Sequence, residues 1–145
     1  MRFWDSSALV PLLVREATTE ALSALAKDEQ AVATWWSSEV ECASAIARHQ
    51  RMGALDSSKA QEAFERLKAL RGSWVVIDPV DSIRSSAQRL LRVHEMRAAD
   101  ALQLAAALVA SEGRPSGLEL VCLDDRLNDA ARKEGFEVID RSRLG

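Results

Sequence analysis

The chain has 145 residues, of which 48% are hydrophobic and 28% are charged, and this balance excludes a disordered or membrane-embedded chain. No apolar run reaches the roughly 20 residues that cross a bilayer. The net charge of −3 argues against indiscriminate nucleic-acid binding, yet 15 of the 19 basic residues are arginines, whose planar guanidinium groups grip phosphate. The length predicts a single domain, residues 1–145.

The cysteines and histidines exclude further classes. Cys42 and Cys122 lie far apart in the chain, and His49 and His94 stand alone, so neither a zinc site nor a disulfide is expected. Asp5 falls where an export signal would have its apolar stretch. We therefore expect a cytoplasmic protein.

Short β-rich runs alternate with helical stretches, which predicts an α/β domain with a mainly parallel sheet. In chain order, we expect a strand at 2–4, helices at 7–14 and 18–27, a strand at 31–35, helices at 38–52 and 57–72, a strand at 74–77, helices at 82–94 and 99–111, a strand at 118–123, a short helix at 124–134 and a strand at 136–139.

Four acidic residues from separate segments are predicted to meet at one edge of this sheet. Asp5 and Asp124 directly follow strands, and Glu41 falls in the first turn of the helix after the second strand. Asp100 begins a helix that must run antiparallel to the strand after it, so it lies at the same carboxyl edge. Ligands bind at this edge in open α/β sheets.

Each acid also has a purely structural explanation. Asp5 and Asp124 could cap helices. Ser38-x-x-Glu41 matches a capping box, and Asp100-x-x-Gln103 fits a similar one. Capping does not require the four acids to share an edge, so we favour one common site.

Clustered carboxylates repel one another, by about 4 kcal/mol per pair at about 4 Å and an effective dielectric constant of about 20. Protons or a divalent cation must offset this repulsion. Oxygen ligands with no histidine or cysteine among them select a hard ion, so the predicted metal is Mg²⁺, with Mn²⁺ possible. The predicted ligands are Asp5, Glu41, Asp100 and Asp124.

The same residues resemble the motifs of the PIN-domain ribonucleases, specifically the VapC-type toxins of type II toxin–antitoxin systems. The four matching segments, in the family's order and spacing, are Phe3-Trp4-Asp5-Ser6-Ser7-Ala8, Glu41 followed by small and apolar residues and Arg48, Arg97-Ala98-Ala99-Asp100-Ala101-Leu102, and Leu120-Val121-Cys122-Leu123-Asp124.

The resemblance implies a PIN-like three-layer α/β/α sandwich with about five strands. It also implies metal-dependent RNA cleavage with Asp5, Glu41, Asp100 and Asp124 as the acidic quartet, Asp5 and Asp100 being the firmest metal ligands. Ser7 matches a position that often supports the site. A cognate antitoxin and a homodimer are implied as partners.

The chain departs from the family pattern at two positions and is ambiguous at two others. Pro11 and Cys122 stand where lysine and threonine are common, and the second puts a hydroxyl contact from the fourth strand in doubt. Asp125 competes with Asp124, and Glu39 with Glu41; the predicted register favours Asp124 and Glu41. Arg97 and Arg126 could hold substrate phosphates or be solvated helix charges.

Three other functions remain open. A phosphoacceptor receiver would carry adjacent acids after the first strand and a lysine in a late strand, and the predicted strands here have neither. A PIN-like module that binds without cutting, and a hydrolase of small phosphoesters, fit the same acids. Apolar stripes at 18–27 and 57–70, with Trp35-Trp36, could dock an antitoxin or a second copy, although burial in the core is the commoner fate of such residues.

Overall fold

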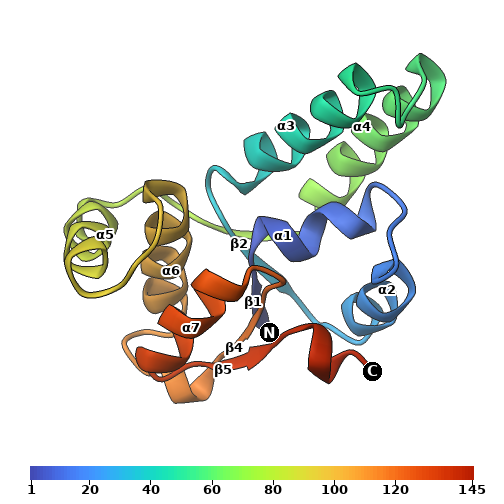
Figure 1. Ribbon diagram of the computed structural model, residues 1–145. Helices are drawn as coiled ribbons and strands as arrows, with labels where there is room; N and C mark the ends of the chain where they lie inside the picture. The colour runs from blue at the N-terminus through green and yellow to red at the C-terminus, as the bar shows by residue number, and fades with distance from the viewer.

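The computed structural model describes residues 1–145 and contains one five-stranded sheet in which every pair of neighbours is parallel (Figure 1). The strand order is β3-β2-β1-β4-β5. The strands are β1 (Arg2–Trp4), β2 (Val32–Trp35), β3 (Val75–Ile77), β4 (Glu119–Val121) and β5 (Glu137–Ile139). The α/β class is confirmed, and the sheet is wholly rather than mainly parallel.

Seven α-helices connect or flank the strands. They are α1 (Ser6–Leu9), α2 (Thr19–Lys27), α3 (Ser38–Arg51), α4 (Ser57–Arg71), α5 (Asp81–Val93), α6 (Ala98–Ala110) and α7 (Asp125–Lys133). Three short 3-10 turns, η1 (Val10–Leu12), η2 (Pro115–Gly117) and η3 (Arg141–Arg143), complete the chain. None of the helices is long and apolar enough to cross a membrane.

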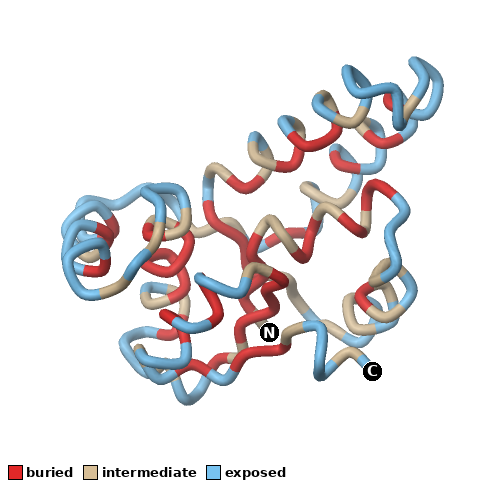
Figure 2. Tube along the Cα trace, in the orientation of Figure 1, coloured by how far each residue is buried: buried red, intermediate tan, exposed pale blue.

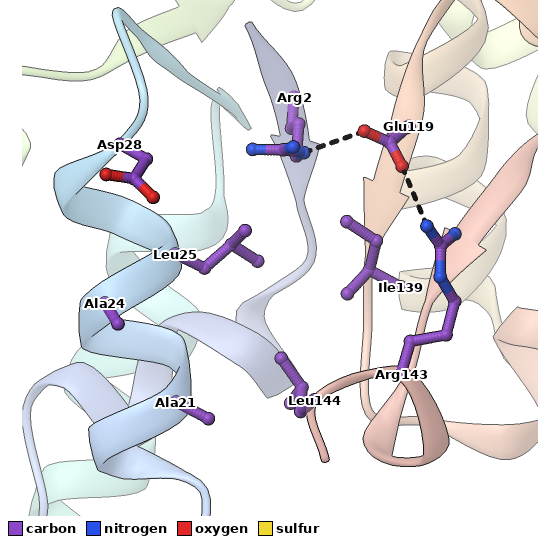
Figure 3. Close-up of a pocket in the computed structure, with 9 residues that line it drawn as sticks. All are labelled: Arg2, Ala21, Ala24, Leu25, Asp28, Glu119, Ile139, Arg143 and Leu144. Carbon is purple, nitrogen blue, oxygen red and sulfur yellow. Dashed lines mark hydrogen bonds and ion pairs between the residues drawn. The ribbon is translucent and has the colours of Figure 1, made fainter.

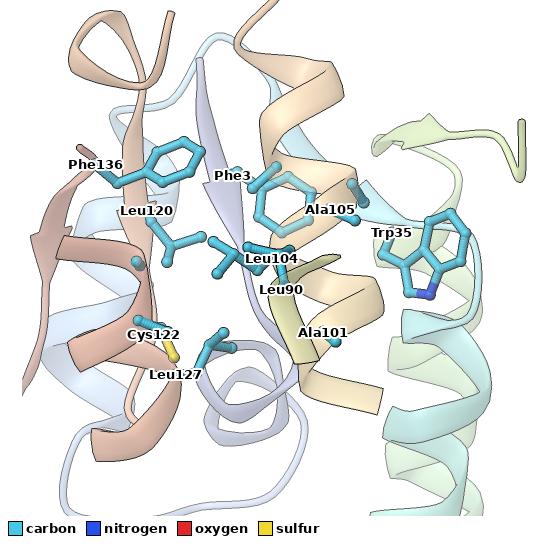
Figure 4. Packing of buried hydrophobic residues seen from close by; sticks show 14 of the residues in the cluster. Phe3, Trp35, Leu90, Ala101, Leu104, Ala105, Leu120, Cys122, Leu127 and Phe136 are labelled. Carbon is cyan, nitrogen blue, oxygen red and sulfur yellow. The ribbon is translucent and has the colours of Figure 1, made fainter. Parts of the chain in front are cut away.

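The central strand β1 contributes residues to two hydrophobic clusters on opposite faces of the sheet. Phe3 and Trp4 are both fully buried, and successive strand residues point to opposite faces. Phe3 packs with α5, α6 and α7 through residues such as Leu90 and Leu104 (Figure 4). Trp4 packs with α1 to α4. The buried strands between two helical layers (Figure 2) confirm the three-layer sandwich.

The apolar stripes that could form docking faces are at least partly buried in the core. Leu22 of α2 and Ala60, Ala63 and Leu67 of α4 are buried in the same cluster as Trp4. Trp35 is also buried, whereas its neighbour Trp36 is 58% exposed. The stripes therefore contribute to folding, and of the Trp pair only Trp36 lies at the surface.

Two predicted elements are shorter than expected. The helix expected at 7–14 ends as an α-helix at Leu9 and continues as the 3-10 turn η1, because Pro11 has no N–H to donate and its ring crowds the preceding turn. The strand expected at 118–123 is paired only over β4, Glu119–Val121. The residues after β4 leave the ladder to build the edge described next.

Candidate functional site

A hollow of about 640 Å³ opens at the carboxyl edge of the sheet, beyond the ends of β1 and β4. It brings together residues from four separate segments of the chain. Its lining consists of Ser6, Glu41, Arg48, Arg97, Ala99, Asp100, Asp124, Asp125 and Arg126. Three of the four predicted acids line this carboxylate pocket, and the fourth, Asp5, lies beneath it.

Asp5 follows β1 directly and is only 3% exposed. Its carboxylate caps α1 by accepting a hydrogen bond from the Ser7 amide at 3.0 Å, as predicted. Burial, with a smaller contribution from the charges of Glu41 and Asp100, raises the pKa of Asp5 to about 6 against the opposing hydrogen bonds from Ser7. Asp5 therefore caps α1 and also lies within electrostatic range of Glu41 and Asp100.

Glu41 reaches the pocket from the first turn of α3, but not through the predicted capping box. Ser37 rather than Ser38 precedes the helix, and its hydroxyl donates to Glu41 at 3.2 Å. The side-chain amide of Gln103, on α6, donates to Glu41 at 2.9 Å and to the buried Ser38 hydroxyl at 3.0 Å. Gln103 thus ties α3 to α6 and is not the box partner of Asp100 that its spacing indicated.

Asp100 is the third residue of α6, which begins one residue earlier than expected. Its half-buried carboxyl group accepts a hydrogen bond from the backbone of Arg97, the residue before the helix. Burial raises the pKa of Asp100, and the charges of Asp124 and Glu41 add to that effect, while the Arg97 amide and guanidinium oppose it. Asp100 therefore shares an electrostatic environment with two other predicted acids.

Asp124 lies just after β4 and caps α7 by accepting a hydrogen bond from the Leu127 amide at 2.9 Å. Asp125 also lines the pocket, so the two neighbouring acids are not separated by position alone. Glu39, by contrast, is directed away from the pocket into an ion pair with Arg71 at 3.2 Å, about half exposed to solvent.

Cys122 and Ser7 form a small hydrogen-bond network with the residues around Asp5 and Asp124. The Cys122 thiol donates to the Asp5 carboxylate at 3.6 Å, and its sulfur accepts from the Asp124 amide at 3.3 Å and from the Ser7 hydroxyl at 3.6 Å. The Ser7 oxygen in turn accepts from the Leu123 amide at 2.9 Å. The sequence put a hydroxyl contact from the fourth strand in doubt, and the Cys122 thiol makes a contact with Asp5 from this position instead. Burial raises the pKa of Cys122 well above its ordinary value, so it remains a thiol.

The donors suit a hard divalent cation in chemistry and in charge. Five carboxylates, counting Asp5 and Asp125, face three arginines, which leaves two surplus negative charges when all are ionised. As the side chains are placed, however, no group of three or more is drawn close enough to hold a metal ion. The residues fit the predicted ion by type, but their arrangement does not by itself define a coordination shell.

A second hollow, of about 420 Å³, lies between α2 and the amino ends of β1 and β4 (Figure 3). Its arginines are already neutralised, because Arg2 and Arg143 both contact Glu119, at 2.9 and 3.3 Å. These ion pairs fasten the C-terminal turn η3 to the sheet. The hollow therefore has a structural explanation that the carboxylate pocket lacks.

Comparison with known proteins places the chain in a family. No protein-family model matches it. It is 30% identical over 139 residues to ribonuclease VapC45 of Mycobacterium tuberculosis (strain CDC 1551 / Oshkosh), covering 94% of this chain and 92% of that protein.

Two solved structures share the fold. One is PAE2754 from Pyrobaculum aerophilum, with a TM-score of 0.65 and 23% identity, covering 99% of this chain and 90% of that one. The other is a toxin–antitoxin complex from Klebsiella pneumoniae, with a TM-score of 0.60 and 15% identity, covering 86% and 87%. With this fold, the motifs in order and a ribonuclease relative aligned over nearly the full length, the chain belongs to the VapC-type PIN-domain ribonuclease toxins.

Proposed function

We propose that the protein is a Mg²⁺-dependent endoribonuclease that acts as the toxin of a toxin–antitoxin pair. The observation that carries the proposal is the pocket itself, where acids from four distant segments meet and their charges help to raise the pKa of the buried Asp5 and of Asp100. Such an arrangement costs free energy in the absence of a cation, and structural capping alone does not require it.

In the proposed mechanism, Asp5 and Asp100 hold the metal directly, and Glu41 and Asp124 hold it directly or through water. Mn²⁺ would suit the same oxygens. A divalent cation bound here would lower the pKa of a water molecule and stabilise negative charge on the departing oxygen.

The chain's own residues supply position and charge. Ser7 and Cys122 fix the Asp5 carboxylate from below, Gln103 fixes Glu41 from the side, and Arg97 favours the ionised form of Asp100. The attacking water forms a bond to phosphorus, and the bond from phosphorus to the 3′ oxygen breaks. The expected products are a 5′-phosphate and a 3′-hydroxyl.

The proposed partner is a cognate antitoxin, supported by family membership and by the structural neighbour described as a toxin–antitoxin complex. A homodimer stays a prediction of the family resemblance, and a cytoplasmic location stays a prediction of the sequence. Each of the two hydrophobic clusters contains buried residues from both ends of the chain, which supports residues 1–145 as one domain.

The test is cleavage of end-labelled structured RNA by purified, antitoxin-free protein, with Mg²⁺ or with EDTA, alongside an Asp100→Asn variant. We expect cleavage that requires the metal and falls at least a hundredfold in the variant, since Asp100 is the proposed direct ligand. The variant should keep the circular dichroism spectrum of the wild type. Cleavage that survives both EDTA and the substitution would contradict the proposed chemistry, and turnover of small phosphoesters without RNA cleavage would assign the site to another hydrolase class.

A further inference from the structure

Three arginines line the carboxylate pocket, and none of them forms an ion pair or a side-chain hydrogen bond. They are Arg48 on α3, Arg97 before α6 and Arg126 on α7. Many of the other arginines are engaged by acids or carbonyl oxygens, as Arg2, Arg89, Arg132 and Arg143 are. Free guanidinium groups beside five carboxylates are positioned for something other than internal pairing.

The three differ in what they face. The charge of Arg97 acts on Asp100, so this residue has a role within the acidic group. Arg48 and Arg126 have no such assignment. Arg48 lies seven residues after Glu41, two turns along the same face of α3, which places it farther out along the pocket wall.

Arg48 and Arg126 belong to different walls. Helix α3 packs on α1 and α4, whereas α7 packs on α6 and β5 (Figure 1). The acids lie between them, since Asp5 precedes α1 and Asp100 lies in the first turn of α6. A chain that crosses the acids from wall to wall would therefore meet one guanidinium group before them and the other after them.

The pocket also continues on the α7 side. Arg126 is shared with a smaller hollow of about 140 Å³, lined as well by His94, Glu95, Asp129, Ala130 and Lys133. Lys133 lies two turns beyond Arg126 on α7 and adds a second cation along this path. The wall with Arg126 therefore borders a second hollow beyond the acids.

We propose that Arg48 and Arg126 bind two RNA phosphates on opposite sides of the scissile one, so that the substrate crosses the pocket from α3 to α7 and leaves over Lys133. The inference rests on the proposed ribonuclease function and adds the residues that fix the substrate's path. A guanidinium group binds a phosphate through two parallel hydrogen bonds, which gives register as well as affinity. Both are positioning residues, because they contact the substrate away from the bond that breaks.

The first test measures binding rather than cleavage. RNA affinity is determined by fluorescence anisotropy in the Asp100→Asn background, over a range of salt concentrations, for added Arg48→Ala or Arg126→Ala. Each substitution should weaken binding roughly tenfold and reduce the dependence of log Kd on log salt by about one phosphate contact. The matched control is Arg51→Ala, because Arg51 is an exposed arginine on the same helix as Arg48 and lies outside the pocket.

The decisive experiment neutralises single phosphates of the RNA as methylphosphonates, one position at a time. The losses of binding free energy from Arg48→Ala and from a neutralised phosphate should be non-additive at one position of the RNA. For Arg126→Ala they should be non-additive at a different position, and the cleavage site should lie between the two. In the otherwise wild-type enzyme, both alanine variants should raise KM with kcat changed less than threefold, and Arg126→Lys should recover only part of the affinity.

The outcomes separate this inference from the proposed function. If Mg²⁺-dependent cleavage holds but neither arginine couples to a phosphate, or both couple to the same one, the path is wrong and the ribonuclease stands. The path is equally wrong if Arg51→Ala weakens binding as much as Arg48→Ala. If the wild type neither cleaves nor binds RNA, both the proposed ribonuclease function and the proposed substrate path are wrong.

Discussion

Asp5 combines two properties that a folded chain rarely brings together, near-complete burial and neighbouring negative charges. In the folded protein its pKa is about 6, against 3.8 for a free aspartate. Between these values the folded state holds a proton that the unfolded chain has already released. Unfolding therefore releases a proton, and the free energy of unfolding falls as the pH rises through this range.

We predict that Asp5→Asn stabilises the metal-free protein at pH 7.5 by on the order of 2–3 kcal/mol, because the amide keeps the cap of α1 and carries no charge. Thermal unfolding in EDTA would measure this as a rise in Tm of about 5–10 °C. The advantage should shrink below pH 4, where Asp5 is protonated in both states. An equal difference at both pH values would contradict the role assigned to burial.

Mg²⁺ provides the converse measurement at the same residue. Added metal should raise the Tm of the wild type and leave that of Asp5→Asn nearly unchanged, since ligand binding stabilises only the protein that binds it. A metal-dependent rise of equal size in both proteins would remove Asp5 from the proposed ligands.

At this scale the sequence located the acids and one supporting residue, Ser7, but missed the other supports. The positions of Asp5, Glu41, Asp100 and Asp124 follow from the parallel order of the strands, which needs no side-chain detail. Gln103 lies 65 positions after Ser38 and 62 positions after Glu41, so no local spacing indicates its contacts with them. The Cys122 thiol and Arg48 were visible as residue types, but their directions depend on tertiary packing.

Among the elements, α3 and α6 are coupled at the pocket by one buried side chain. Gln103 is 1% exposed and donates both its amide hydrogen bonds across the interface, while its oxygen is buried without a partner. The orphaned oxygen costs stability, so the residue is better explained by the placement of Glu41 than by packing.

We predict that Gln103→Met lowers the rate of RNA cleavage roughly tenfold and raises the Mg²⁺ concentration required, because Glu41 loses its orientation. The free energy of unfolding should change by only about 1 kcal/mol, since the lost hydrogen bonds are offset by removal of the unpaired oxygen. Cleavage rates across a Mg²⁺ titration, with thermal unfolding in parallel, would measure both. Ser38→Ala is the control, because it spares the bond to Glu41; equal losses in the two variants would contradict this account.

The elements themselves were largely predictable. Short β-rich runs and helical stretches placed all five strands and seven helices, most of them within a few residues. The exceptions have local causes. Pro11 ends α1 early, and Ser37 rather than Ser38 precedes α3 because Ser38 is drawn into the interior towards Gln103.

Across the whole molecule, the two hydrophobic clusters share the sheet but contact different helices. Trp4 reports on one and Trp35 on the other. The test uses two variants, one in which Trp4 is the only tryptophan and one in which Trp35 is the only tryptophan. If residues 1–145 are one cooperative domain, both variants should show the same urea midpoint by fluorescence and by far-UV circular dichroism. Separate midpoints for the two fluorescence signals would divide the chain into independent units.

The central position of β1 has a consequence for the protein's synthesis. Its neighbour β4 is hydrogen-bonded to it from more than 110 residues away, and the Cys122 amide beneath the acids bonds to Ile139 of β5. A ribosome must therefore release the chain through β4 and β5 before Asp5 and Asp124 can be held together. A nascent polypeptide that ends short of β4 carries Asp5, Glu41 and Asp100 yet no assembled pocket, so the pocket forms only after these last two strands have left the ribosome.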